Sequence, residues 1–213
     1  MSEAVVKSTR RYDSSRRQNA ADRRRQAVLA AAGHRFLRDG YAATTVASIA
    51  ADAGVSVEMI YKVFAAKSGL VRALWEIGLA GEGPVPAETR SDEVSATETD
   101  PQLTVASWAR LSMEVAPRVA PVLLLVRAAA ATDPEMDALR DELDTQRLVR
   151  MTHNVDALIQ AGHLREGITA DHARDVLLTY SAPEIYELLV LRRGWSLEEY
   201  SEFIRQGIAA ALL

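Results

Sequence analysis

The sequence contains no cysteine, which excludes disulfide bonds, thiolate metal sites and catalytic thiols. No segment approaches the roughly 20 consecutive apolar residues that a membrane span needs. The N-terminus is polar and rich in arginine, and it lacks the hydrophobic core of a secretory signal. We therefore expect a soluble, cytoplasmic protein with no membrane partner.

Strand-like patterns are missing as well, because apolar and polar residues nowhere alternate over a sustained stretch. Almost every periodic segment has helical spacing, and 213 residues with 48% hydrophobic content can build one good-sized domain or two modest ones. The four histidines are scattered and lack the spacing of metal ligands. No nucleophile–base pair, acid dyad or cofactor loop is present. We predict an all-α protein that is not an enzyme and holds no metal or cofactor.

The net charge of -4 is divided unevenly along the chain. Residues 1–75 contain 13 lysines and arginines against six acids, a net charge of +7, so the remainder carries -11. A basic N-terminal segment followed by an acidic remainder suggests that the N-terminal segment binds a polyanion. The arginines of residues 1–25 could contact phosphates or the minor groove, or residues 1–20 could be a solvated, disordered arm.

The basic part of the chain contains the pattern of a small helical domain. One helix is predicted over Asp22–Asp39, and a second of about eight residues follows Thr45, whose side chain can cap its first turn. Gly54 makes a very short turn, after which Ser56 can cap a third short helix. Two short helices joined by a tight turn behind a longer one form the skeleton of a three-helix, helix-turn-helix DNA-binding head.

These patterns divide the chain into three parts. They are an arm at 1–20, a helix-turn-helix domain at 21–66 and a helical body at 67–213. Within the body, residues 81–101 are rich in glycine, proline, serine and threonine among acids, which predicts a loop or linker. Further along, a helix should break around Pro117. At 195–200 the pattern fits a capping box with a hydrophobic staple, in which Trp195 packs on Tyr200.

A helix that enters a DNA groove needs an outward face that is free of core contacts and phosphate anchors at its ends. Hydroxyls at helix N-termini, a lysine and a phenol can serve as such anchors. The expected partner is double-stranded operator DNA. The residues predicted to contact it are Thr44, Thr45, Ser56, Val57, Glu58, Tyr61, Lys62 and Lys67.

These residues lie in a longer pattern that closely resembles the DNA-binding head of TetR-family repressors, with the spacing preserved without a gap over about 50 residues. The segments that carry the resemblance are Phe36–Val46, Ile49-Ala50, Ala53–Ser56, Ile60-Tyr61, Phe64 and Lys67. The resemblance implies that backbone contacts to DNA come from Thr45, Ser56, Tyr61 and Lys67.

The sequence departs from the family pattern at three positions. The family often has a basic residue where Ala47 stands, a glycine where Glu58 stands, and a histidine or aromatic residue where Val63 stands. Direct base reading by the second helix is therefore not expected. The Glu58 carboxylate could either accept a hydrogen bond from cytosine or face solvent.

The resemblance further implies a homodimer formed through the C-terminal helices and release from DNA when a small effector binds the body, so that residues 67–213 bind the effector and dimerise. A mainly apolar effector is expected, and the candidates to contact it are Trp108, Met113, Met151, His153, Asn154 and Tyr180. An activator or a corepressor-dependent regulator would share the same head, and a helical enzyme with an incidental helix-turn-helix is the alternative from another class.

Overall fold

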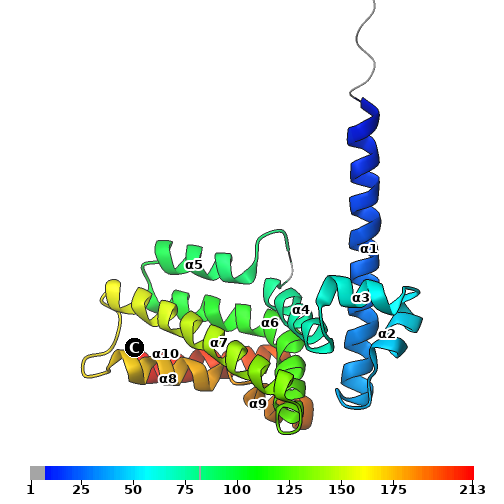
Figure 1. The fold of residues 1–213 in the computed structure, drawn as a ribbon. Helices are drawn as coiled ribbons and strands as arrows, with labels where there is room; N and C mark the ends of the chain where they lie inside the picture. The colour runs from blue at the N-terminus through cyan, green and yellow to red at the C-terminus, as the bar shows by residue number, and fades with distance from the viewer. Residues whose placement is uncertain (1–7, 82) are drawn as a thin grey trace, which may run out of the picture. The chain divides into compact units, whose positions relative to one another are not determined.

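The computed structural model describes residues 8–81 and 83–213, with side chains from Arg16 onward. These residues form helices and no strand, which confirms the all-α prediction (Figure 1). They divide into two compact units on either side of the Ala73–Leu74 bond, whereas the sequence pattern placed the boundary after residue 66. None of the helices among these residues is both long enough and apolar enough to cross a membrane.

The N-terminal unit has a small core made by one long helix and two short ones. Phe36, Ile49 and Ile60, one from each helix, are at most 1% exposed. Each helix contributes apolar residues at intervals of three or four, so one stripe of each faces this core. The helices are α1 (Ser8–Asp39), α2 (Val46–Ala53), α3 (Val57–Phe64) and the first half of α4 (Lys67–Ala80).

Helix α1 is longer than predicted, since it begins at Ser8 and not at Asp22. No proline interrupts residues 8–39, and arginine, glutamine and alanine, which are good helix formers, are frequent there. In Figure 1, α1 extends well past the two short helices of its own unit. Most of the predicted arm is therefore helical, and residues 1–7 lie outside the described residues.

The capping groups predicted from the sequence are in place around α2 and α3. The Thr45 side chain accepts a hydrogen bond from the backbone amide of Ser48, and that of Ser56 accepts one from the amide of Met59. Gly54 has φ 64° and ψ 36°, a left-handed conformation that a β-carbon makes costly. Local sequence thus sets the ends of both short helices.

The turn between α3 and α4 is unusually tight. Ala65 has φ 63° and ψ -45°, and the amide of Ala66 donates to the carbonyl oxygen of Phe64 at 2.7 Å, which closes a strained three-residue turn. A β-carbon on Gly69 would overlap that same carbonyl oxygen. Backbone atoms therefore require glycine at position 69.

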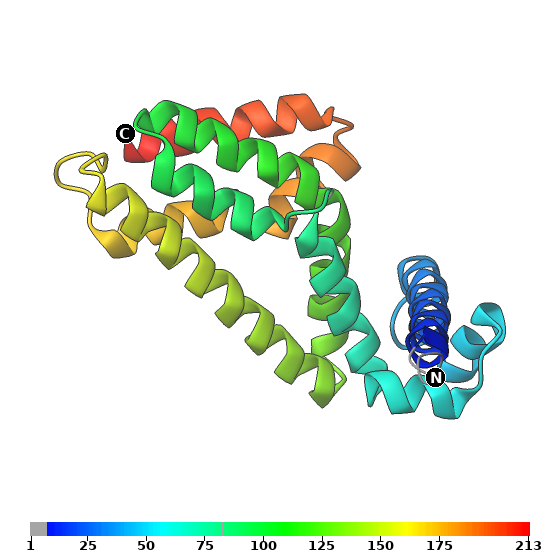
Figure 2. The same cartoon turned by 90° about the horizontal axis from the view of Figure 1, so that it is seen from above.

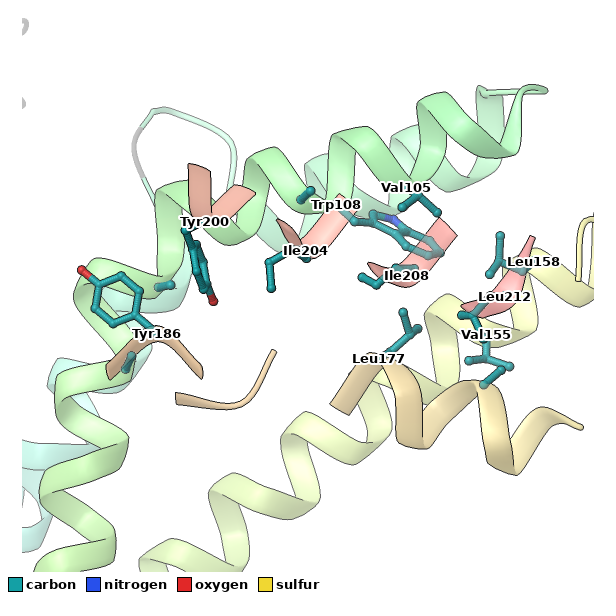
Figure 3. Close-up of a cluster of buried hydrophobic side chains, with 14 residues drawn as sticks. Val105, Trp108, Val155, Leu158, Leu177, Tyr186, Tyr200, Ile204, Ile208 and Leu212 are labelled. Carbon is teal, nitrogen blue, oxygen red and sulfur yellow. The ribbon is translucent and has the colours of Figure 1, made fainter. Parts of the chain in front are cut away.

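Five helices of the C-terminal unit contribute to a buried apolar cluster (Figure 3). Leu158 of α7, Leu177 of α8 and Ile204 of α10 are at most 2% exposed within it, and α6 contributes Val105 and Trp108. Besides the end of α4, the helices of this unit are α5 (Ala87–Thr97), α6 (Pro101–Ala130), α7 (Pro134–Gln160), α8 (Ala170–Tyr180), α9 (Pro183–Tyr186), the π-helix η1 (Glu187–Arg192) and α10 (Leu197–Leu212).

The linker predicted at 81–101 is wrong for most of its length, because α5 occupies Ala87–Thr97. This helix lacks an apolar stripe, so its sequence reads like a loop. Tertiary contacts hold it instead: Arg90 forms a two-pronged ion pair with Glu114 of α6 at 2.6 and 2.9 Å, and the indole of Trp108 donates to the Ser95 hydroxyl at 3.2 Å. Contacts with another helix therefore stabilise α5 as a helix, although its own sequence favours a loop.

The predicted break at Pro117 is also wrong, because α6 continues through both Pro117 and Pro121. A proline inside a helix removes one backbone donor and commonly bends the helix without ending it. Figures 2 and 3 show that α6 changes direction along its course. Buried residues on both sides, Trp108 and Val126 among them, anchor the two arms of the bent helix.

The start of α10 shows one correct detail and one error. The capping box is confirmed, since the Ser196 side chain accepts from the amide of Glu199 and the Glu199 carboxylate accepts from the amide of Ser196. The predicted staple is wrong in its partner. Trp195 lies edge-on to Phe203, with ring centroids 5.9 Å apart, while Tyr200 is buried in the apolar cluster.

The α3–α4 turn generates a prediction about the stability of the N-terminal unit. Replacing Gly69→Ala should destabilise it by at least about 1–3 kcal/mol, because the methyl group meets a backbone oxygen that cannot move without reshaping the turn. Replacing Ala65→Gly in the same turn should leave stability equal or higher, since relief of the left-handed strain offsets the added freedom of the unfolded chain. Thermal and urea unfolding followed by circular dichroism measures both. A neutral Gly69→Ala variant would contradict this geometry.

Candidate nucleic-acid interface and internal cavity

Helix α3 separates its side chains into a core face and an outward face. Ile60 and Phe64 are buried, whereas Tyr61 on the other side is 49% exposed. The sequence spacing therefore places a polar face outward within the N-terminal unit, as a groove-reading helix requires. The residues of this face that are exposed or half-buried are Val57, Glu58, Tyr61 and Lys62.

Two hydroxyls stand at the starts of the short helices. Those of Thr45 and Ser56 belong to exposed residues, and each accepts a hydrogen bond from its own helix, at 3.1 and 3.2 Å. A hydroxyl that accepts in this way keeps its own proton for donation. Thr45 can therefore donate to a phosphate oxygen beside the first amides of α2, which also favour an anion.

The carboxylate of Glu58 is engaged at the start of α3. A hydrogen bond from its own backbone amide, and then one from the Ser56 hydroxyl, hold the pKa of Glu58 below its ordinary value. The side chain is exposed and ionised at neutral pH, and it caps its own helix. This arrangement favours the solvent-facing interpretation of Glu58 over hydrogen bonding with a base.

Thr44 does not belong to the outward surface. It is 1% exposed, and its hydroxyl donates to the carbonyl oxygen of Gly40 at 2.8 Å. The prediction that its side chain faces DNA is therefore wrong. Adjacent threonines look alike in sequence, and only the path of the chain before α2 decides which one is buried.

Lys67 is placed by the fold inside the N-terminal unit. Its ammonium group donates to the carbonyl oxygens of Tyr41 and Thr44 at 3.0 and 3.2 Å, and it lies 3.9 Å from the centroid of the Tyr41 ring. Two of the three ammonium donors are thus used to bind the loop before α2. The structure gives Lys67 a clear structural role, and its contact with DNA stays a prediction.

Charge on α1 adds to the positive character of this unit. Arg23 and Arg24 are exposed, and the guanidinium of Arg25 lies over the Phe64 ring, 5.5 Å from its centroid. Arg35 forms a two-pronged ion pair with Asp52 of α2 at 2.5 and 2.8 Å, which lowers the pKa of that carboxyl group chiefly through the hydrogen bond. Cations therefore both project from the unit and join its helices.

The C-terminal unit contains a partly open cavity of about 520 Å³. Its wall is largely apolar and comes from α4, α5, α6, α7, α8 and α10, and the α6 residues in it lie on both sides of the two prolines. Of the six candidates named from the sequence, Trp108, Met151 and Asn154 line this cavity.

The other three candidates lie outside the cavity wall. Met113 is half-buried on α6, and His153 is exposed with its Nε2 3.2 Å from a carboxylate oxygen of Asp92. The Tyr180 ring packs on Phe203, with centroids 5.6 Å apart. Residue type alone therefore could not separate wall residues from their neighbours.

Two arginines of α7 that the sequence analysis missed lie in the wall. Arg150 donates to Asp92 at 2.6 Å and to the Ser91 hydroxyl at 2.7 Å. Arg147 donates to Asp144 at 3.2 Å, and burial lowers its pKa while Asp144 raises it. The spacing of positions 147, 150, 151 and 154 was the available signal, since it defines one helical face.

Tyr200 also lines the cavity without having been predicted. Its ring meets Tyr186 edge-on at 5.5 Å (Figure 3), and burial, followed by the neighbouring tyrosine, raises the pKa of its hydroxyl to about 12. The phenol therefore stays protonated at neutral pH. It gives an otherwise apolar part of the wall a hydrogen-bonding group.

The family model described as bacterial regulatory proteins of the tetR family matches residues 28–74. No curated protein matches the chain. Among solved structures, a TetR-family regulator from Rhodococcus sp. is 15% identical, with 90% of this chain and 100% of that one covered and a TM-score of 0.68.

Two further structures are similar over the same length. NalD from Pseudomonas aeruginosa, described as the secondary repressor of the MexAB-OprM multidrug efflux pump, is 18% identical over 92% of this chain and 98% of its own, with a TM-score of 0.69. FadR from Bacillus subtilis, solved with stearoyl-CoA, is 19% identical over 88% and 99%, with a TM-score of 0.70.

The head and the fold define a class of structure: a helix-turn-helix head of the kind found in tetR-type regulatory proteins, followed by an all-helical body. The match over residues 28–74 covers α2, α3 and the start of α4, the elements that present the outward face. Residues 28–74 thus match the family model of tetR-type bacterial regulatory proteins, and the chain resembles solved TetR-family regulators in fold.

The contrast between the two lysines of the head is testable. Lys67→Met should lower the unfolding free energy by about 1.5–3 kcal/mol, because hydrogen bonds from a charged donor to buried carbonyls are removed. Lys62→Met, at an exposed position, should leave stability within about 0.5 kcal/mol of the original. Chemical denaturation of both variants provides the measurement. Equal stabilities would show that the Lys67 contacts are energetically unimportant.

Proposed function

We propose that the chain is a ligand-responsive repressor that binds operator DNA as a homodimer and is released by a small, mainly apolar effector. Helix α3 enters the major groove, and Thr45, Ser56, Tyr61 and Lys62 contact the DNA around it. The cavity of the C-terminal unit receives the effector. The observation that carries the proposal is the exposed face of α3, within the matched TetR segment, in a chain that also contains a cavity.

The size and character of the cavity support a small-molecule effector. Pockets for small ligands usually have about 300–1,000 Å³ and mostly apolar walls with a few polar groups. The cavity here, at about 520 Å³, has Leu111, Val119 and Ile208 among its apolar wall residues. NalD, a similar structure, is a repressor, and FadR was solved with a ligand that has a long acyl chain.

Helix α4 can couple effector binding to DNA binding, because one continuous helix contributes residues to both units. Lys67 at its start binds the loop before α2, while Trp75 and Leu79 near its end line the cavity. A ligand that moves the end of a rigid helix also moves its start. By linkage, DNA must weaken effector binding by the same factor by which the effector weakens DNA binding.

Dimerisation through the C-terminal helices is supported by exposed apolar side chains near the end of the chain. Leu188 is 50% exposed and Leu191 56%, both on η1, and Trp195 follows. Clustered apolar exposure is typical of an interface. A two-fold dimer would present two α3 helices about 34 Å apart, one turn of DNA.

The proposal is tested by selecting bound DNA from a random duplex library, then screening compounds for release of that DNA. Expression from the target promoter in a deletion strain gives the sign of regulation. If the proposal is right, the selected site is near-palindromic and expression increases on deletion. A fall in expression would identify an activator or a corepressor-dependent regulator.

Filling the cavity should separate DNA binding from effector response. In Val115→Phe, the added ring occupies part of the cavity, whose wall residues all belong to the C-terminal unit. The variant should bind the selected site with unchanged affinity and need at least about tenfold more effector for release, since one blocked subsite costs about 1.4 kcal/mol or more. Fluorescence anisotropy of labelled DNA measures both. Release at the original effector concentration would place the effector elsewhere.

The basic start of α1 should contribute to DNA binding through phosphates. Deleting residues 1–18 removes Arg16, Arg17 and the basic residues before them, and it should reduce the slope of log affinity against log salt by about 0.9 for each phosphate that these cations neutralise. Deleting only residues 1–7, which contain a single basic residue, is the matched control. An unchanged slope in the longer deletion would mean that the arm does not contact DNA.

A further inference from the structure

We infer that the effector carries a hydrogen-bond-accepting oxygen, such as the carbonyl oxygen of a ketone or an ester, on an apolar body, and that the hydroxyl of Tyr200 donates to this oxygen. The inference deepens the proposed function and rests on it. It gives the ligand a chemical class and gives one residue of α10 a role in recognition.

Tyr200 lies in the cavity wall, and its ring is held in place. The residue is 1% exposed, and its ring meets that of Tyr186 edge-on, with centroids 5.5 Å apart (Figure 3). Edge-to-face packing is a preferred arrangement of two aromatic rings. The position of the Tyr200 hydroxyl is therefore set before a ligand enters.

The Tyr200 hydroxyl has no hydrogen-bond partner among the residues that the structure describes. The side-chain oxygen of Asn154, in the same wall, is enclosed by protein atoms, whereas the Tyr200 oxygen is not. Because Tyr200 is almost fully buried and lines the cavity, the accessible surface of its oxygen faces the cavity. Buried tyrosine hydroxyls usually have a partner, so we expect a ligand atom to supply this one.

The other hydroxyls of the wall are already committed. Those of Ser112, Thr145 and Ser181 donate to carbonyl oxygens three or four residues earlier, at 3.0, 2.8 and 3.2 Å. That of Ser91 accepts from Arg150 at 2.7 Å. Among the described residues, Tyr200 thus contributes the wall hydroxyl that remains without a partner.

The unpaired hydroxyl of Tyr200 favours a ligand group that accepts a hydrogen bond. Burial, followed by the neighbouring Tyr186, raises its pKa to about 12, so the phenol keeps its proton at neutral pH. The lone pair of a phenol oxygen is partly delocalised into the ring, which makes the group a better donor than acceptor. A carbonyl oxygen on the ligand matches this donor.

The wall beside the hydroxyl is apolar along α10. Tyr200, Ile204 and Ile208 are spaced four residues apart, so they share one face of the helix and follow one another along it (Figure 3). At a rise of about 1.5 Å per residue, this face extends over about 12 Å. Leu177 of α8 adds to the same apolar wall. An acceptor bound at Tyr200 therefore has room beside it for an apolar body.

The test compares two probes of nearly the same shape on the full chain without DNA. They are octan-2-one, which accepts a hydrogen bond, and 2-methyloct-1-ene, in which a methylene group replaces the carbonyl oxygen. Both compete with N-phenyl-1-naphthylamine, an uncharged dye whose fluorescence rises in apolar surroundings. Tyr200→Phe should weaken ketone binding about fivefold, the loss of one net hydrogen bond, and should leave alkene binding within about twofold.

Two controls separate recognition from packing. Tyr200→Phe keeps the ring that packs on Tyr186, so its affinity for the dye should be unchanged and its thermal midpoint should match or exceed that of the original, because an unpaired buried hydroxyl is removed. Tyr186→Phe alters a buried tyrosine of the same apolar cluster that lies outside the cavity wall, and it should leave both probes unaffected.

The inference is overturned if Tyr200→Phe binds the ketone as tightly as the original chain, if it loses affinity for both probes equally, or if neither probe displaces the dye up to its solubility limit. These outcomes are distinct from failure of the proposed function. That failure would appear as an absence of specific DNA binding or of ligand-dependent release, and neither enters this binding assay.

Discussion

The ammonium group of Lys67 holds the beginning of α4 to the loop that precedes α2. Without this cation, the carbonyl oxygens of Tyr41 and Thr44 would lack their charged donor, and buried carbonyl groups are costly to leave unpaired. The strained turn at Ala65 and the close approach at Gly69 constrain the same segment, which joins α3 to α4. Before α3, the left-handed Gly54 and the Ser56 cap fix the turn from α2, so α3 is held at both of its ends.

The C-terminal unit is under a different constraint, because it contains a cavity beside a closely packed core. Close packing is the rule in protein cores, and unfilled volume lowers stability. Pro117 and Pro121 lie within the bent helix that forms one wall. Arg150 of α7 binds Asp92 of α5, and Arg147 of α7 donates to the Ser181 carbonyl at the end of α8. Asn154, a residue of the cavity wall, has a buried side-chain oxygen that accepts no hydrogen bond among the described residues. Sites that depart from good packing and full hydrogen bonding are expected where a protein binds a ligand.

The head was largely predictable because its signals are local. Thr45 and Ser56 cap the helices that follow them within three residues, and Gly54 takes a conformation that glycine favours. The resemblance of residues 36–67 to a TetR-type head added the expectation of which exposed residues bind DNA. Thr44 was misplaced because its burial depends on the path of the chain before α2. The structural contacts of Lys67 were missed because its partners lie 23 and 26 residues earlier, and its contact with DNA stays a prediction.

By itself, the sequence determined that the protein is helical, that a basic helix-turn-helix precedes an acidic body, and where most short helices begin. These properties depend on periodicity, capping and composition, which act over a few residues. Only the tertiary structure decided that α5 is a helix, that α6 continues through two prolines, and that Met151 and Asn154 face the cavity while His153 does not. Those outcomes depend on ion pairs and packing between segments far apart in the chain, whose energies outweigh local preference.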